Sequence, residues 1–326
     1  MITIKKYDNK NINLEKWELF IDSSNASALY FRSWFLDAVC ENWHVIIAMN
    51  GDKWLAVFPF VLKRKYFINY TIQPKFTKYL GILFSNELTD SETLNEQKKI
   101  MTAIINELPK NIIYLNYCFL PTFTYFLPFF WKGFTVTPKI TFRLTVKNEN
   151  KISTSILNHI KKANLNRLQC VEENSLKNIL NLLQIRKLIN SNEINIFNDL
   201  WKKVKNKNTG FSLNILDNKG NTHCGAAIII DKENAYLILS VVNFKFKKDG
   251  GNALLINTII EKLKNSEIKY LYFEGSMFEN VATYIQGFKA EPMLYYNITK
   301  SKIPLLYNFF LPFDRIFMKF LNLKIY

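Results

Sequence analysis

The stretch from residue 269 to residue 299 constrains the fold most, because it predicts strand, turn, helix, turn and strand without a gap. Residues 268–273 form a short run of β-branched and aromatic side chains, which Gly275 interrupts. Apolar residues then recur at helical spacing as far as Gly287, a residue type that ends helices. A mostly apolar run follows over 293–298. We therefore expect an α/β structure that closes with strand, helix and strand.

The same pattern occurs earlier in the chain and indicates an internal duplication. Three matches lie at offsets of 155, 156 and 154 residues. The matched segments are 104–108 with 259–263, Tyr114-Leu115 with Tyr270-Leu271, and Gly133-Phe134-x-x-x-Pro138 with Gly287-Phe288-x-x-x-Pro292. The alternative is chance in a sequence rich in Ile, Leu and Asn. A duplication predicts two domains, residues 1–147 and 148–326, which suits a chain of 326 residues.

The composition favours a globular, basic protein in a reducing compartment. Hydrophobic residues make up 48% of the chain and the formal net charge is +16. That charge would attract phosphate-rich partners, or it reflects only a bias toward Lys, since six of the 43 basic residues are Arg. The four Cys and three His are scattered, so we expect free thiols and no metal site. No apolar segment opens the chain, and we expect a cytoplasmic protein.

Two apolar stretches raise the question of membrane contact. Residues 111–131 carry no charge over a length that could span a bilayer, but Pro121 and Pro128 favour a buried strand followed by an aromatic-rich loop. Residues 303–326 combine aromatic side chains with Lys and Arg. That tail is interpreted either as a helix packed on the body or as a peripheral anchor at the inner face of a membrane.

A glycine turn between an apolar strand and a helix is the candidate ligand site. Lys247, Lys248, Gly250 and Gly251 precede an apolar helix pattern that includes Asn252 and Ala253. Such a turn directs free backbone N–H groups and the positive end of a helix at one point, which suits a pyrophosphate. The alternative is a plain turn at a helix start. The first copy has Asn95 and Glu96 at the corresponding place, so we expect no phosphate cradle in the first domain.

These motifs together resemble the GNAT acetyltransferase superfamily. The segment Lys248-x-x-Gly251-x-Ala253 is similar to its acyl-CoA motif, and Tyr284-x-x-Gly287-Phe288 is similar to its closing element. The tandem arrangement, with Trp34-Phe35-Leu36 near the start and Phe273-Glu274-Gly275 near the end, resembles the double-GNAT proteins of the FemAB-like and BioF2-like type, which are related to peptidoglycan aminoacyltransferases. The resemblance covers nearly the whole chain.

The resemblance implies two tandem GNAT-like domains, each a largely antiparallel sheet flanked by helices. It implies an acyltransferase that moves an acyl group from acyl-CoA to an amine by direct attack, with the donor held by Lys247, Lys248, Gly250, Gly251, Asn252 and Ala253. Aminoacyl-tRNA is the alternative donor. The implied acceptor is an amine-bearing small molecule or a peptidoglycan precursor. A degenerate, non-catalytic binding protein is the third alternative.

Two side chains are candidates for the chemistry itself. Glu274 follows a predicted strand, where a partly buried carboxylate can have a raised pKa and accept a proton from an attacking amine. The alternative is a carboxylate that caps the next helix. Tyr284, in the closing element, completes the catalytic set that the resemblance implies. No Gly-x-Ser-x-Gly elbow surrounds Ser276, so a serine nucleophile is not expected.

Overall fold

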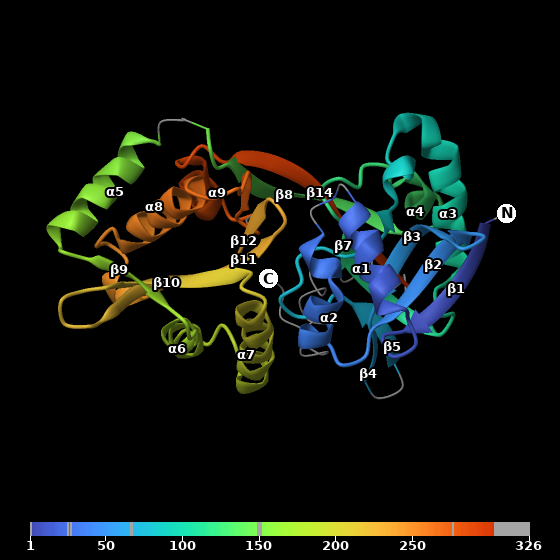
Figure 1. Ribbon diagram of the computed structural model, residues 1–326, viewed down its shortest axis with the longest axis horizontal. Coiled ribbons are helices and arrows are strands. Elements are labelled where there is room, and N and C mark those ends of the chain that lie inside the picture. Colours follow the sequence, from blue (N-terminus) through green and yellow to red (C-terminus); the bar gives the residue numbers. More distant parts are fainter. Residues whose placement is uncertain are drawn as a thin grey trace. The chain divides into compact units, whose positions relative to one another are not determined.

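The computed structural model describes residues 2–24, 26, 28–65, 68–148, 152–275 and 277–302. The chain forms two compact units (Figure 1). Unit 1 comprises Met1–Pro138 with Tyr295–Tyr326, and unit 2 comprises Lys139–Leu294. The predicted membrane anchor at 303–326 lies outside the described residues.

Unit 1 contains two sheets with helices beside them. One sheet has the order β1-β2-β3-β6 and the other has β4-β5-β7-β14. Its elements are β1 (Ile2–Asp8), α1 (Leu14–Ser23), η1 (Leu29–Phe31), α2 (Ser33–Val39), β2 (His44–Asn50), β3 (Lys53–Phe60), β4 (Leu62–Lys65), β5 (Ile68–Ile72), β6 (Leu83–Phe84), η2 (Asn86–Leu88), η3 (Ser91–Thr93), α3 (Leu94–Glu107), β7 (Ile112–Cys118), α4 (Leu127–Trp131) and the start of β8 (Thr135–Thr145).

Local sequence chemistry explains the first elements of unit 1. The Asn13 side chain accepts a hydrogen bond from the Lys16 N–H and so begins α1. Gly51 has a φ of +59° and lies in the tight turn that connects β2 to β3, as an Asn-Gly pair predicts. Ser33 is the first residue of α2, and its hydroxyl lies within hydrogen-bond distance of the Glu18 carboxylate.

The uncharged stretch at 111–131 is divided between two elements. It begins with the central strand β7 and ends with the short helix α4, where an irregular loop alone was expected. Pro128 stands in the first turn of α4, a position where its missing N–H costs no hydrogen bond. Within the described residues, no helix has both the length and the apolar character to cross a membrane.

Unit 2 is one sheet with the order β8-β13-β12-β11-β10-β9 and helices around it. β10, β11 and β12 form an antiparallel meander. Its further elements are α5 (Thr154–Leu165), β9 (Gln169–Glu173), α6 (Lys177–Ile185), α7 (Ser191–Asn206), β10 (Gly210–Leu216), β11 (Thr222–Asp231), β12 (Asn234–Val242), η4 (Phe244–Phe246), α8 (Gly251–Lys264), β13 (Tyr270–Tyr272), α9 (Glu279–Gln286) and the start of β14 (Glu291–Ser301).

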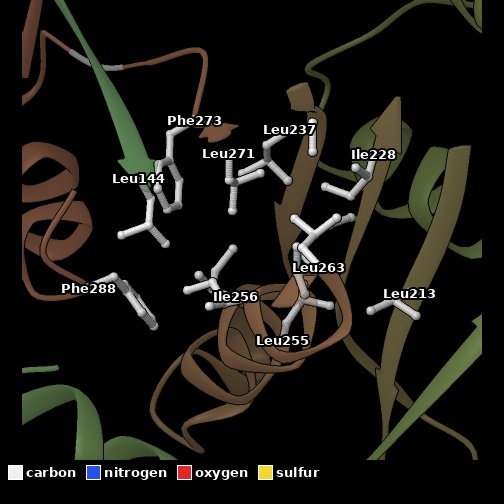
Figure 2. Close-up of a cluster of buried hydrophobic side chains, with 14 of the residues drawn as sticks. Leu144, Leu213, Ile228, Leu237, Leu255, Ile256, Leu263, Leu271, Phe273 and Phe288 are labelled. Carbon is white, nitrogen blue, oxygen red and sulfur yellow. The ribbon is translucent and has the colours of Figure 1, made fainter. Parts of the chain in front are cut away.

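The core of unit 2 lies between α8 and one face of the sheet. Figure 2 shows Leu255, Ile256 and Leu263 of α8 directed toward strand residues such as Leu271 and Leu237. Leu255 and Leu271 have no exposed surface, so the apolar face of α8 is fully covered. Burial of this face fixes the position of the helix start, where the glycine turn lies.

The duplicated pattern is present as a repeated order of elements. A helix, a strand, a short helix and an 11-residue strand occur as α3-β7-α4-β8 and again as α8-β13-α9-β14. Gly133 and Gly287 each follow the short helix of their copy. Gly133 has a φ of +75°, whereas Gly287 has a φ of −58°, so the two turns differ in detail.

The long strands exchange units. Residues 143–145 of β8 pair with β13 in unit 2, and residues 297–301 of β14 pair with β7 in unit 1. The compact units therefore divide near residues 138 and 295, while the sequence pattern suggested a single division at residue 147. The repeat in the sequence is regular, but the strand that ends each repeat belongs to the sheet of the other.

Candidate active site at the divergence of β12 and β13

Two parallel strands separate in the middle of the unit 2 sheet. β12 and β13 pair in parallel over three residues, and the last partners are Tyr236 and Tyr272. β13 ends there, whereas β12 continues to Val242 alongside β11. A register shift in the β11–β12 ladder lies next to this point, between Ala227 and Ile228. Beyond Tyr236, the described chain offers β12 no strand partner on its β13 side, which leaves backbone groups for a ligand.

Glu274 stands two residues beyond the end of β13. Its φ is +55°, in the left-handed region that a glutamate adopts at a cost of about 1–2 kcal/mol. Both carboxylate oxygens are shielded from solvent. α9 begins only at Glu279, with Phe278 at its N-cap and no side-chain cap bond. Glu274 is therefore not the N-cap residue of α9.

The glycine turn lies at the start of α8, as predicted, but protein atoms occupy the space beside it. Gly250 is the N-cap and has a φ of +84°. A Cβ atom on Gly250 would lie 2.1 Å from the His159 carbonyl oxygen and 3.0 Å from the Ala163 nitrogen. The backbone of α5 thus passes over the turn. Gly250 is needed for this close approach, so a bound phosphate is not required to explain the glycine.

α5 is fixed at both ends of its path across α8. Near its start, the Ser153 N–H donates to the Gly287 carbonyl at 2.8 Å. A Cβ on Gly287 would lie 2.8 Å from Ile156 of the same helix. Just beyond its end, the Asn166 amide donates to the Asp249 carbonyl at 3.3 Å. α5 therefore runs from the end of α9 to the start of α8.

A buried histidine beneath the turn was not expected from the sequence. His223 is 4% exposed, and its ring stacks on Phe246 at 4.1 Å and 11°. Its Nε2 lies 3.6 Å from the Asp217 carboxylate and its Nδ1 lies 3.7 Å from the Asp249 carboxylate. The three residues come from separate segments, so no spacing in the sequence could have revealed them. The Asp249 carboxylate therefore lies next to His223, close to the glycine turn at Gly250.

Tyr284 and Asn252 are brought together at the first turn of α8. The Tyr284 hydroxyl and the Asn252 Oδ1 are both buried, and neither makes a hydrogen bond of ordinary geometry in the described chain. Burial raises the pKa of Tyr284, Cys224 raises it further, and the Asn252 side chain lowers it slightly. Tyr284 is therefore protonated at neutral pH and can donate a proton but not accept one from an amine.

The remaining predicted donor residues surround the turn in different environments. The side chains of Lys247 and Lys248 are exposed, whereas Gly251 and Ala253 are buried against β10 and β11. Lys161 and Lys162 on the outer face of α5 are also exposed, and α5 carries no acidic residue. The surface on this side of unit 2 is therefore basic. Nowhere in the described ranges do three His, Cys, Asp or Glu side chains gather in a way that could hold a metal ion.

Comparison with solved structures identifies the fold. FemX matches with a TM-score of 0.63 and 10% identity over 94% of this chain and 99% of its own. A tandem GNAT protein from the clavulanic acid biosynthesis pathway matches with a TM-score of 0.56 and 7% identity over 92% and 98%. The chain has a tandem GNAT fold.

A third solved structure matches over most of the chain. The L-PGS of Bacillus licheniformis matches with a TM-score of 0.52 and 10% identity over 87% of this chain and 90% of its own. No protein-family model matches the sequence, and no curated protein does. The tandem GNAT fold is therefore established by structure alone, and the predicted FemAB-like resemblance is confirmed at the level of fold.

Proposed function

We propose that this tandem GNAT protein transfers an acyl or aminoacyl group to an amine, with Glu274 as the base. The observation that carries the proposal is the position of Glu274, a shielded carboxylate held in a left-handed conformation where β12 and β13 separate. Unusual backbone conformations of this kind concentrate at functional sites. The free backbone edge of β12 beside it suits an extended ligand.

The proposed reaction needs no covalent enzyme intermediate. The acceptor amine attacks the donor carbonyl carbon, a C–N bond forms, and the bond from that carbon to the leaving sulfur or oxygen breaks. Glu274 takes the proton that the amine loses, and the leaving group gains a proton. Tyr284, whose phenol is protonated at neutral pH, is the proposed donor of that proton. Holding both substrates together supplies most of the acceleration in such a mechanism.

The environment of the glycine turn favours aminoacyl-tRNA over acyl-CoA as the donor. A CoA pyrophosphate at Gly250 would meet the carbonyl oxygen of His159, and the Asp249 carboxylate lies close by. Both groups repel a phosphate. The exposed Lys161 and Lys162 on α5 instead present a basic surface that suits an extended polyanion. The proposed acceptor is an amine-bearing small molecule or a peptidoglycan precursor.

The Glu274→Gln variant tests the chemistry. We expect its turnover to fall by about 10²–10⁴-fold, because the neutral amide cannot accept a proton. Its donor affinity and melting temperature should stay close to those of the parent protein. Glu279→Gln is the matched control, because Glu279 is an exposed glutamate in the first turn of α9, and it should keep full turnover. An equal loss of stability and turnover in Glu274→Gln would assign Glu274 a structural role instead.

A donor panel tests the substrate class. We expect charged tRNA to support transfer and to bind with an affinity that falls steeply as salt rises. The double variant Lys161→Ala/Lys162→Ala should flatten that salt dependence by about one unit of slope for each lost phosphate contact. Lys202→Ala/Lys219→Ala, which removes two exposed lysines elsewhere in unit 2, should leave it unchanged. Transfer from a CoA thioester alone would restore acyl-CoA as the donor, and no transfer from either would favour a binding protein.

A further inference from the structure

The short helix α4 of unit 1 exposes its apolar side chains to solvent. Leu127, Phe130 and Trp131, called here the α4 patch, are 38%, 59% and 54% exposed. They stand at positions i, i+3 and i+4, so they share one face of the helix. Pro128 and Phe129, on the other face, are buried and hold α4 in place. The outer face of α4 is therefore apolar where a surface helix is normally polar.

Four lysines, called here the lysine cluster, surround the α4 patch. α3 lies beside α4 (Figure 1), and Lys98 of α3 places its Nζ 5.1 Å from the Trp131 ring centroid. Lys132 directly follows Trp131. The Lys300 ammonium donates to the Lys132 carbonyl at 2.8 Å, and the Lys302 ammonium donates to the Lys110 carbonyl. None of the four forms an ion pair with a carboxylate within the described residues.

The lysine cluster carries unneutralised charge at short range. The pKa of Lys300 is lowered first by burial and then by the neighbouring Lys302 and Lys132. Its Nζ also lies 4.6 Å from the Phe134 ring centroid, so the Lys300 ammonium makes a cation–π interaction with Phe134. The protein thus tolerates mutual repulsion of cations beside an exposed apolar helix. An anionic partner with an apolar interior would reduce the repulsion between the lysines and would also remove the apolar side chains of α4 from water.

We propose that the α4 patch and the lysine cluster form a docking surface for a membrane that contains anionic phospholipids. The Phe130 and Trp131 rings enter the boundary between headgroups and acyl chains, and the four ammonium groups stay at the level of the lipid phosphates. A protein partner would need its own acidic rim and apolar pocket to match both features. A lipid surface supplies both without any specific shape. Two aromatic side chains alone anchor weakly, so binding requires the lysines as a second contribution.

Vesicle sedimentation with the full chain tests this surface. We expect binding to phosphatidylcholine vesicles that contain phosphatidylglycerol, and much weaker binding to phosphatidylcholine alone. Phe130→Ser/Trp131→Ser should lower the partition coefficient by at least about tenfold, because two large apolar groups no longer leave water. Lys98→Gln/Lys132→Gln should lower it by about fivefold for each lysine, and added salt should have a similar effect.

A matched control distinguishes binding through this surface from non-specific hydrophobic binding to vesicles. Leu165→Ser/Ile185→Ser removes two apolar side chains that are 82% and 76% exposed on unit 2, and it should leave the partition coefficient unchanged. Trp131→Phe should keep most of the binding but abolish the blue shift of tryptophan emission that vesicles cause. These variants change exposed side chains, so their melting temperatures should match that of the parent protein.

Four results would overturn the proposal. Equal binding of the parent and the Phe130→Ser/Trp131→Ser variant would place any membrane contact elsewhere, and loss of binding on removing residues 303–326 would place it in that segment. Equal binding to neutral and anionic vesicles would exclude the electrostatic part. A change from dimer to monomer in the Trp131→Ser variant without vesicles would make the α4 patch an interface between two copies. The proposal does not depend on acyl transfer, since every measurement is made without substrate.

Discussion

An added methyl group at Gly250 would meet the backbone of α5. The contact at 2.1 Å is with a carbonyl oxygen, which cannot rotate away as a side chain would. The φ of +84° adds a conformational cost for any residue with a Cβ. Gly250 therefore reports how firmly α5 is held against the start of α8.

Comparison of two glycine substitutions measures this packing. Gly220 has a φ of +79° and nothing within 4 Å of an added Cβ, so Gly220→Ala should cost only about 1–2 kcal/mol for the left-handed conformation. Gly250→Ala should cost about 1–3 kcal/mol more, because α5 must move. Urea unfolding of both variants gives the difference. Equal losses of unfolding free energy would mean that α5 is not packed on Gly250 in solution, which would reopen the space for a donor phosphate.

Asp217 links the stability of unit 2 to acid pH. Its pKa falls from 3.8 to about 2, first because the Asn221 side chain donates to its carboxylate, with the N–H groups of Asn221 and Lys219 and the nearby His223 acting in the same direction. Because the folded pKa is lowered, the carboxylate stabilises the fold above pH 3.8, and this contribution is lost as the pH falls toward about 2.

The Asp217→Asn variant checks this pH window. The difference in unfolding free energy between parent and variant should be constant above about pH 5 and should shrink as the pH falls toward 2. Asp199→Asn is the control, because its carboxylate pairs with Lys202 at an exposed site. A difference that does not depend on pH would show that Asp217 acts through packing and not through its charge.

At the scale of elements, most of unit 2 could be predicted because its sequence signals are local. The meander β10–β11–β12, the start of α8 at a glycine pair and the β13–α9 segment each follow from short periodic patterns and turns. The path of α5 could not be predicted, because the pattern of an amphipathic helix does not say which surface it covers. His223 and its two carboxylates were missed for the same reason, since only the folded chain brings them together.

Asn297 tests how strongly the exchanged strand β14 supports unit 1. Its side-chain amide donates to Asn116 Oδ1 at 2.6 Å and to the Tyr117 carbonyl at 3.2 Å. Asn297→Ala removes this donor from the buried Tyr117 carbonyl and the half-buried Asn116 side chain, so it should cost about 1–3 kcal/mol. Amide hydrogen exchange should speed up in β7 of unit 1 and stay unchanged in β10 and β11 of unit 2. Equal acceleration in both would mean that the two units unfold as one.

At the scale of the whole molecule, the sequence repeat and the compact units follow different boundaries. The repeat could be recognised because each copy ends in a Gly-Phe pair and a long strand. The exchange of β8 and β14 could not, because a strand has the same alternating pattern whichever sheet it joins. Unit 2 is consequently one continuous segment, while unit 1 combines the start of the chain with residues 295–302.

Fragments of the chain test this arrangement. Residues 139–294 should unfold cooperatively as an isolated fragment, because they include the part of β8 that pairs with β13 and the whole core of unit 2. Residues 148–294, which lack β8, should not, because β13 loses its partner. Residues 1–138 should also fail, because β7 lacks β14. Circular dichroism during urea titration distinguishes these outcomes, and a stable fold of residues 1–138 would show that β14 is dispensable.

The exchanged strands also determine which unit can complete its sheet first during translation. Residues 1–138 of unit 1 are synthesised before unit 2, yet β14, which pairs with β7 on the side away from β5, emerges only after every residue of unit 2 has been made. During that interval the apolar edge of β7, Ile112–Cys118, waits without its neighbour and is open to pairing with other nascent chains. Of the two units, the one whose first residues are translated earlier is therefore the one that is completed later.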